Sequence, residues 1–322
     1  MKINDPIYGN FTLEPVLTEL IQTKPLQRLK NIYQGGASYL VNPAWNVTRF
    51  EHSLGVMLLI RKLGGSLEEQ IAGLLHDISH TAFSHVIDFV LNHAEQDFHD
   101  QIFEEILLSS EIPSVLQQHG FSLASLLPIE KWSLLEQPLP LLCADRIDYT
   151  LRDLSTYNMI SLEEASQFVG SLYVHDEKIC VTSIEAAEWF VESYYKEVID
   201  FFLNPLNVYG YATLTNILKV AINKKYIQLQ DFLLDDAKLW EKITMIEDKK
   251  VKQMVQSLDK HAIESRDTYD IHQKKKIRII DPLVFLEGAG VKKATELSDR
   301  VLEYNKKALK KSHEGTFVKV LH

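Results

Sequence analysis

The chain has 322 residues, of which 46% are hydrophobic, and carries a formal net charge of -10. This length and apolar content suffice for a folded globular protein, either one large domain or a main domain with an appendage. The composition excludes a disulfide framework, because there are only two cysteines, and no apolar run approaches the roughly 20 residues that span a bilayer. The N-terminus lacks the pattern of a signal peptide, so we expect a cytoplasmic protein without membrane insertion.

Apolar residues recur at helical spacing from about residue 14 onward, which predicts an array of helices. The spacing is clear in residues 52–64, 66–80 and 99–110. Gly64 and Gly65 end the first of these helices. Ser66 followed by Glu69 predicts a capping box that opens the second.

The stretch LLHDISHTAFSH, residues 74–85, places four ionisable side chains inside this helical, apolar pattern. They are His76, Asp77, His80 and His85. Burying polar groups costs free energy unless each finds a partner, so a cation or a phosphate is expected nearby. Taken alone, the histidine–aspartate pair is equally consistent with a structural role.

Segments after residue 170 are less uniformly helical. Residues 171–181 contain two short β-prone runs and predict a small hairpin, while 185–204 and 211–222 predict long aromatic core helices. Residues 278–285 and 313–322 are interpreted as either strands or short extended segments. We therefore predict an all-α fold: a helical bundle with a small β-hairpin insertion and a C-terminal mixed subdomain.

Charge is distributed unevenly along the chain. Residues 241–322 hold 18 Lys and Arg against 13 Asp and Glu, whereas residues 1–240 hold 16 against 31. We interpret 1–240 as the main domain, with its core motifs in 34–160, and 241–322 as a basic subdomain packed on it. The basic runs HQKKKIR and NKKALKK are predicted to form solvated helix faces, with contact to a nucleotide or nucleic acid as the alternative.

Four side chains from three segments have the chemistry of an open metal site. His76 and Asp77 are adjacent on one helix, so a cation at the helix surface could take both. His52 begins an upstream helix, and Asp145 lies in an apolar stretch where an unpaired carboxylate would be costly. Two imidazoles and two carboxylates leave room for water or a phosphate oxygen. The set accepts Mn, Fe, Mg, Zn, Ni or Co.

Hydrolysis of a phosphate ester is the reaction that suits such an ion, because a divalent metal activates water and stabilises charge on a phosphoryl group. His80, His85 and Asp88 follow closely enough to line the same cleft. A histidine paired with an acid is suited to donating a proton to a leaving oxygen. His99, next to Asp100, is a second candidate of this kind.

Five stretches are spaced almost continuously over residues 3–160: INDPIYGNFTLEPVLTELIQT, QRLKNIYQGGASYLVNP, RFEHSLGV, LLHDISHTAFSHVID and ADRIDYTLRD. In these stretches the chain resembles the HD-domain nucleotide hydrolases, in particular the dNTP triphosphohydrolases. The resemblance implies an all-α fold, a homo-oligomer, and a metal held by His52, His76, Asp77 and Asp145.

The same resemblance implies roles for further residues. It places His80, His85, Asp88 and His99 at the phosphates, with His85 and His99 as the proton-transfer groups. It places Arg49 on phosphate oxygens, and Arg146 where the family has a phosphate-contacting lysine. It implies that Gln34 and Asp153 bind the 3′-hydroxyl and that Tyr149 packs on the sugar, although ordinary packing is the alternative for Gln34 and Tyr149.

The chain departs from this family where the triphosphate and an activator are recognised. The stretch 200–214 lacks the basic residues that the family usually supplies after the hairpin, which weakens triphosphate binding unless the C-terminal lysines replace them. The stretch 21–24 lacks the acidic residue that, in the family, hydrogen-bonds the guanine base of an activating nucleotide. Activation by a nucleotide is therefore not expected.

We predict an active enzyme, a metal-dependent phosphohydrolase acting on (deoxy)nucleotides, with dNTP cleavage to deoxynucleoside and triphosphate as the leading reaction. An HD-type nucleotidase or phosphodiesterase acting on mono- or cyclic nucleotides fits the missing basic residues almost as well. A non-catalytic nucleotide sensor is the alternative of another class, but retention of His85, Asp88 and His99 argues against it. Nucleic-acid binding is not favoured.

Overall fold

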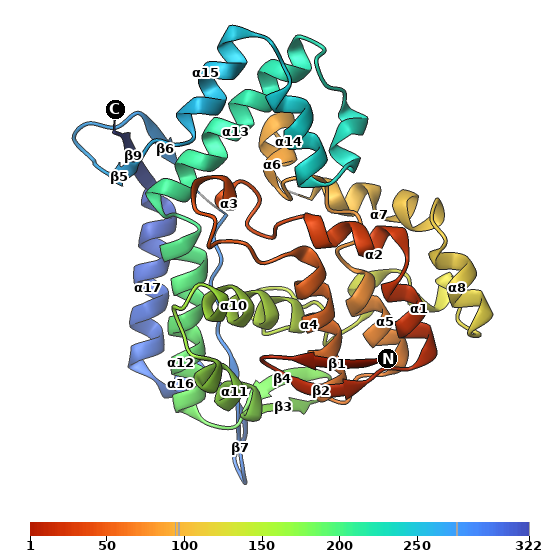
Figure 1. Ribbon diagram of the computed structural model, residues 1–322. Helices are drawn as coiled ribbons and strands as arrows, with labels where there is room; N and C mark the ends of the chain where they lie inside the picture. The colour runs from red at the N-terminus through yellow and green to blue at the C-terminus, as the bar shows by residue number, and fades with distance from the viewer. Residues whose placement is uncertain (94, 96, 275, 322) are drawn as a thin grey trace.

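The protein is described by a computed structural model that covers residues 1–93, 95, 97–274 and 276–321 (Figure 1). It is 55% helical with 12% strand, and the strands form three small sheets. The predicted all-α class is therefore wrong: the molecule is a helical body with a substantial sheet component. Strands do form in the predicted hairpin and within residues 278–286 and 313–322, but three of the six strand pairings among the described residues join distant segments, which local alternation of apolar and polar residues could not reveal.

Seventeen α-helices among the described residues form the body of the molecule. They are α1 (Pro15–Ile21), α2 (Lys24–Arg28), α3 (Ser38–Val41), α4 (Arg49–Lys62), α5 (Leu67–Leu75), α6 (Val86–Leu91), α7 (Phe98–Leu108), α8 (Ile112–Gln118), α9 (Leu123–Leu126), α10 (Ala144–Thr156), α11 (Leu162–Gly170), α12 (Ile184–Tyr195), α13 (Pro205–Asn223), α14 (Asp236–Thr244), α15 (Lys249–Ser257), α16 (Ala294–Leu297) and α17 (Asp299–Glu314). A π-helical segment, η3 (Lys196–Phe201), continues α12, and short 3-10 turns are η1 (Leu29–Asn31), η2 (Ile129–Lys131) and η4 (Leu229–Leu233). Within the described residues, no helix combines the length and apolar character that crossing a membrane requires.

Two of the three sheets join distant parts of the chain. An N-terminal hairpin pairs β1 (Lys2–Asp5) with β2 (Gly9–Thr12). The predicted hairpin, β3 (Leu172–His175) and β4 (Lys178–Val181), is extended by β7 (Leu283–Leu286), parallel to β4, and by β8 (Gly290–Lys293). A third sheet places β9 (Thr316–Val320) between β5 (Ala262–Glu264) and β6 (Ile271–Gln273).

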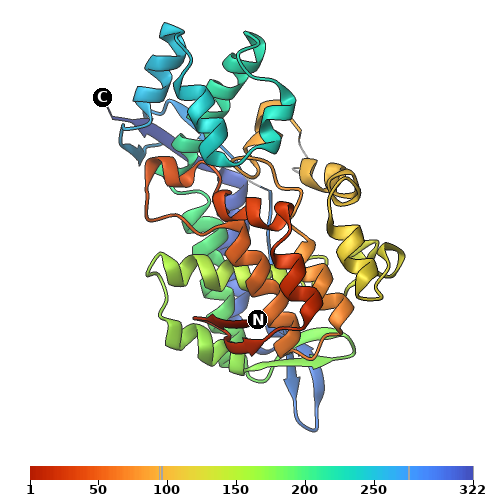
Figure 2. The ribbon, with the colours of Figure 1, turned by 45° about the vertical axis from the view of Figure 1, so that its right-hand side comes forward.

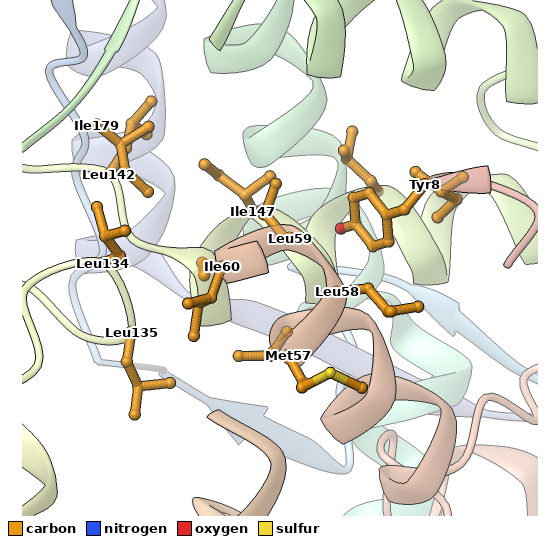
Figure 3. Close-up of a cluster of buried hydrophobic side chains, with 14 of the residues drawn as sticks. Tyr8, Met57, Leu58, Leu59, Ile60, Leu134, Leu135, Leu142, Ile147 and Ile179 are labelled. Atoms are coloured by element: carbon orange, nitrogen blue, oxygen red, sulfur yellow. The ribbon is translucent and has the colours of Figure 1, made fainter. Parts of the chain in front are cut away.

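Helix α4 lies at the centre of the largest hydrophobic core. Residues 56–60 are fully buried, so this part of the helix is covered on every side rather than on one face. Figure 3 shows Met57, Leu58 and Leu59 among side chains from other elements, including Tyr8 and Ile147. This packing fixes α4, whose first turn carries Arg49 and His52, relative to α5 and α10.

The N-terminus of α5 has only half of the predicted capping box. Ser66 Oγ accepts a hydrogen bond from the Glu69 backbone N–H at 3.1 Å, as expected. The Glu69 carboxylate does not return to Ser66 but accepts from the Leu134 N–H at 2.7 Å. It therefore ties the loop before α10 to the helix.

The stretch LLHDISHTAFSH is not a continuous helix. Helix α5 ends at Leu75, and the chain then turns through residues 76–85, with Phe83 and Ser84 at φ 62° and 49°. Asp236 stabilises this backbone, since its Oδ1 accepts from the Phe83 N–H at 2.6 Å. Left-handed backbone at a bulky residue is strained and persists only where surrounding contacts hold it, which is common at functional sites.

The two basic runs of the C-terminal region differ in structure. NKKALKK, residues 305–311, belongs to α17, where Lys306, Lys307 and Lys310 are exposed as predicted. In HQKKKIR, residues 272–278, the described residues form no helix: His272 and Gln273 belong to β6, and residues 276–278 are irregular and lead toward β7 (Figures 1 and 2). The division into domains 1–240 and 241–322 stays a prediction.

Candidate metal centre and active site

One large cavity, with a volume of about 690 Å³, opens where α4, α10, the end of α5 and the turn after it meet. Its wall includes twelve of the thirteen side chains predicted for the site, and Asp88 is the one that does not line it. Those twelve are Gln34, Arg49, His52, His76, Asp77, His80, His85, His99, Asp145, Arg146, Tyr149 and Asp153. The functional roles assigned to these residues stay predictions; their positions are described below.

The four predicted metal ligands converge at the base of the cavity. His52 Nε2 lies 3.0 Å from Asp145 Oδ1 and 3.8 Å from Asp77 Oδ2. His76 Nε2 lies 3.4 Å from Asp77 Oδ1 and 3.6 Å from Asp145 Oδ1. Ligand atoms about 2.1 Å from one cation stand about 3.0 to 3.4 Å apart, so these separations are close to those of a common first coordination shell.

In His52 and His76 the Nδ1 atom makes a hydrogen bond outside the cluster, which leaves the Nε2 atom of each ring to bind a metal. His52 Nδ1 lies 2.8 Å from Asp148 Oδ2, and His76 Nδ1 lies 2.7 Å from the Gly73 carbonyl. With Nδ1 donating in each case, both Nε2 atoms face the cluster, where a divalent cation would displace any proton that they carry. His76 Nε2 is buried without a hydrogen-bond partner among the described residues. An orphaned imidazole nitrogen beside two carboxylates fits a divalent cation.

The electrostatics of the cluster also favour a cation. Burial alone lowers the pKa of His52, but the carboxylates of Asp145 and Asp148 outweigh it and raise the pKa to about 10. Burial raises the pKa of Asp77, yet Arg49, whose Nη1 lies 2.9 Å from Asp77 Oδ2, holds the pKa well below its usual range. Three buried carboxylates therefore stay negative and attract positive charge.

A second layer of contacts, which the sequence analysis did not identify, fixes His52 in place. Asp148 Oδ1 accepts from the Tyr8 hydroxyl at 2.8 Å and from Arg152 Nη2 at 2.9 Å. Arg152 in turn lies 3.0 Å from Asp5 Oδ2. The spacing of Asp148 and Arg152 by one helical turn was a visible signal of this pair. The network ties the N-terminal hairpin to the metal centre.

Gly55 packs directly against this network. A Cβ atom built at Gly55 would lie 2.0 Å from Asp148 Oδ1 and 2.1 Å from Arg152 Nη2. Gly55→Ala is therefore expected to lower the free energy of unfolding by at least about 2 kcal/mol, because the buried ion pair must separate. Urea denaturation measures the loss. Gly170→Ala is the matched control, since a Cβ there meets nothing within 4 Å, and equal stability of the two variants would contradict the packing.

A second group of histidines lies beside the metal centre. His80 Nε2 lies 3.1 Å from Asp77 Oδ1, and its ring stacks on His99 with centroids 3.9 Å apart. His85 Nδ1 lies 3.2 Å from Asp88 Oδ2, which explains why Asp88 can act on the site without lining the cavity. The histidine–acid pairing predicted for proton transfer is therefore present geometrically at His85.

His85 and His99 are neutral near pH 7 in the free protein. Burial, reinforced by Arg49, outweighs Asp88 and lowers the pKa of His85. Burial, together with the repulsion between the two imidazoles when both are protonated, lowers the pKa of His99 to about 3. An anion bound beside the rings would raise both pKa values. The pair can then take up and return a proton at a leaving oxygen.

The predicted sugar-binding residues line the same cavity. Gln34 Nε2 donates to Asp153 Oδ1 at 2.8 Å, while Gln34 Oε1 is buried without a hydrogen-bond partner in the described part of the chain. Burial raises the pKa of Asp153, and burial with the charge of Asp153 raises that of Glu197 on the π-helical segment, so this acid pair retains a proton. Tyr149 and Tyr194 line the same wall.

Arg146 is engaged by the protein itself. Its guanidinium donates to the Leu141 carbonyl, to the Gln137 carbonyl at 3.2 Å and to Cys143 Sγ at 3.2 Å. Glu136, Cys143 and Asp145 also form a compact donor group, but Arg146 already supplies positive charge there and burial keeps the pKa of the Cys143 thiol high. We do not assign a second metal to this group.

Comparison with known proteins identifies several relatives. The family model described as HD domain matches residues 49–153. The chain is 50% identical to the uncharacterized protein YdhJ of Bacillus subtilis over 100% of this chain and 99% of that protein. It is 31% identical to the metal-dependent phosphohydrolase cns2 of Cordyceps militaris over 89% of this chain and 85% of that protein.

Two further similarities are more limited: one covers a smaller region of the chain, and the other has a lower sequence identity. The chain is 40% identical to the human deoxynucleoside triphosphate triphosphohydrolase SAMHD1 over 141 residues, which are 37% of this chain and 22% of that protein. A phosphohydrolase structure from Bacteroides thetaiotaomicron superposes with a TM-score of 0.72 at 20% identity, covering 93% of this chain and 94% of that one, and shows a shared fold.

Proposed function

Because the chain belongs to the HD-domain metal-dependent phosphohydrolases, we propose that its substrates are nucleotides and that it converts a dNTP and water to deoxynucleoside and triphosphate. One observation carries the proposal. The Gln34–Asp153 pair, with its unpartnered Gln34 Oε1, faces the same cavity as the metal cluster. A ribose hydroxyl supplies the donor and acceptor that this pair lacks. The similarity to the human triphosphohydrolase, limited to its HD region, supports the choice of dNTP.

Each part of the cavity then has a chemical task. A divalent ion held by His52, His76, Asp77 and Asp145 supplies Lewis acidity and an activated water when bound. Gln34 and Asp153 fix the sugar, and Arg49 places a fixed guanidinium fork next to the phosphate. His85, held by Asp88, and His99 exchange a proton with the leaving 5′-oxygen. Binding at both ends of the reacting bond limits the substrate to one orientation.

Product analysis tests the proposal. Metal-loaded protein is incubated with dNTPs, NTPs, mononucleotides and cyclic nucleotides, and products are separated by ion-exchange chromatography. Inorganic triphosphate and deoxynucleoside in equal amounts are the expected result. Orthophosphate released from monophosphates would instead assign a nucleotidase, and the absence of turnover with every metal would leave a nucleotide sensor.

The nucleotidase is retained as a second candidate on one structural observation. Arg49 is paired with Asp77, and Arg146 lies 3.6 Å from Glu136 Oε1 and also donates to backbone carbonyls, so both predicted phosphate cations are already engaged. A triphosphate carries about four negative charges and needs several cationic partners, whereas a monophosphate needs fewer.

Gln34→Ala is expected to lower kcat/KM for nucleotides about 10- to 100-fold, the cost of one buried hydrogen-bonding group. Hydrolysis of p-nitrophenyl phosphate, which has no sugar, should change little, and metal content should be unchanged. Steady-state kinetics on both substrates measure the difference. Gln117→Ala, at an exposed site, is the control. Equal losses on both substrates would show that Gln34 does not act on the sugar.

A homo-oligomer stays a prediction, for which sedimentation of the metal-loaded protein is the direct measurement. The aromatic helices predicted to supply an interface bury many of their rings internally, Phe190 and Tyr194 among them. An interface must therefore use other surfaces of the molecule.

A further inference from the structure

Two cations that the sequence analysis placed on a solvated face line the cavity instead. Among its described wall residues, the only lysines and arginines are Arg49, Arg146, Lys276 and Arg278. The first two are engaged by Asp77 and by backbone carbonyls. Lys276 and Arg278 have no carboxylate within 4.0 Å in the described part of the chain, so their charges are available to a ligand.

Arg278 is a half-buried residue of the cavity wall. Its guanidinium carbon lies 5.7 Å from the centroid of the Phe202 ring, and Nη1 donates to the Lys276 carbonyl at 3.4 Å. It is close enough to act electrostatically on His85 and on Tyr149. Arg278, His85 and Tyr149 line the same cavity.

The segment that carries Arg278 is held at both ends. Before it, β6 pairs with β9. After it, the Ile280 N–H donates to the Tyr195 hydroxyl at 3.4 Å, and Asn305 Nδ2 donates to the Ile280 carbonyl at 3.1 Å. The Asp281 N–H then donates to the Pro140 carbonyl at 2.9 Å. Figures 1 and 2 show the chain after residue 275 running down to β7, at the opposite end of the molecule from β6.

Arg278 is half-buried in the cavity wall without an acidic partner among the described residues, and the chain on either side of it is held by hydrogen bonds. Removing such a charge from water costs free energy unless an anion binds beside it. The chemistry of the site identifies that anion. The inner phosphate of a nucleotide lies at the metal cluster and Arg49, so further phosphates extend toward cations not yet engaged. Guanidinium binds phosphate oxygens through two parallel N–H groups, and lysine adds a point charge.

We propose that Arg278, together with Lys276, holds the outer phosphates of a nucleoside di- or triphosphate and makes the cavity selective for oligophosphates over monophosphates. This inference rests on the proposed action on nucleotides. It also supplies what residues 200–214 lack, since that stretch contributes no basic side chain. The C-terminal region thereby takes part in substrate recognition.

The test measures binding of inorganic tripolyphosphate and of orthophosphate to metal-loaded protein by calorimetry, which requires no turnover. Arg278→Gln is expected to weaken tripolyphosphate binding about 10- to 100-fold and orthophosphate binding less than about 3-fold, as for loss of one charge-assisted contact. Arg278→Lys should recover part of the loss. Arg266→Gln, which removes the same charge from an exposed site paired with Glu314, should change neither.

The same variants are then compared in KM for a dNTP and for the matching dNMP. A rise in KM confined to the dNTP supports the inference. Unchanged tripolyphosphate affinity in Arg278→Gln, or equal losses for both anions, would overturn it. If no nucleotide is cleaved, the proposed function fails. The tripolyphosphate measurement still decides whether Arg278 binds the outer phosphates.

Discussion

Asp77→Asn is expected to lower phosphohydrolase activity by at least about 10³-fold and to reduce the metal content of the purified protein. The variant removes a predicted metal ligand, which costs more than removing a residue that only orients a ligand. Asp77 is central to the cluster. Its two oxygens lie 3.4 Å from His76 Nε2 and 3.8 Å from His52 Nε2, and it also pairs with Arg49. The amide keeps the shape of the side chain but loses the charge that a cation requires.

Metal content by mass spectrometry and turnover of the best substrate from the nucleotide panel together measure the effect. Asp259→Asn is the matched control, since it makes the same chemical change at an exposed position. Residual activity within tenfold of wild type at full metal content would exclude Asp77 as a ligand. Loss of activity with full metal content would assign it to the phosphate end of the site through Arg49.

The four side chains predicted to hold a metal lie together in the structure, whereas the contacts around them were not predicted. His52, His76, Asp77 and Asp145 stand out because buried polar side chains in apolar helices need partners, and the structure brings all four together. That argument depends only on residue type and local pattern. It does not depend on knowing which helices touch.

Residues whose roles depend on tertiary contact escaped prediction. Arg278 reaches the cavity only because β6 and β7 join sheets formed with β9 and β4, strands far away in sequence. The basic run around Arg278 has no local feature that distinguishes it from the run in α17, which is solvated. The end of α5 at Leu75 was missed for a similar reason, since Asp236 holds the following turn from another part of the chain.

Asp148 was also overlooked, although it lies in a stretch that the sequence analysis quoted. Its role requires knowing that His52 Nδ1 lies 2.8 Å away and that Arg152 and Tyr8 occupy its other oxygen. We expect Asp148→Asn to lower the free energy of unfolding by about 3 kcal/mol, because Arg152 loses a buried partner. We also expect it to weaken metal binding about 10- to 100-fold, because His52 loses its orienting acid.

The effect on stability should depend on pH in a defined direction. Burial raises the pKa of Asp148, but Arg152 and His52 outweigh it and hold the pKa below its usual range. A carboxyl group of this kind stabilises the fold above its unfolded pKa of about 4, and that stabilisation is lost as the pH falls through the folded value. The stability difference between wild type and Asp148→Asn is therefore largest at neutral pH and shrinks below about pH 4.

Tyr8→Phe distinguishes two effects of Asp148: its orientation of His52 and its contribution to the stability of the fold. It removes one hydrogen bond to Asp148 Oδ1 and leaves the His52 contact to Oδ2 intact, so it should cost about 1 kcal/mol of stability and no metal affinity. Metal titrations and urea denaturation of both variants at neutral pH give the comparison. Equal losses of metal affinity in the two variants would show that Asp148 acts only through stability. A loss confined to Asp148→Asn places the N-terminal hairpin, through Asp5, Arg152 and Asp148, in the framework that orients the metal ligand.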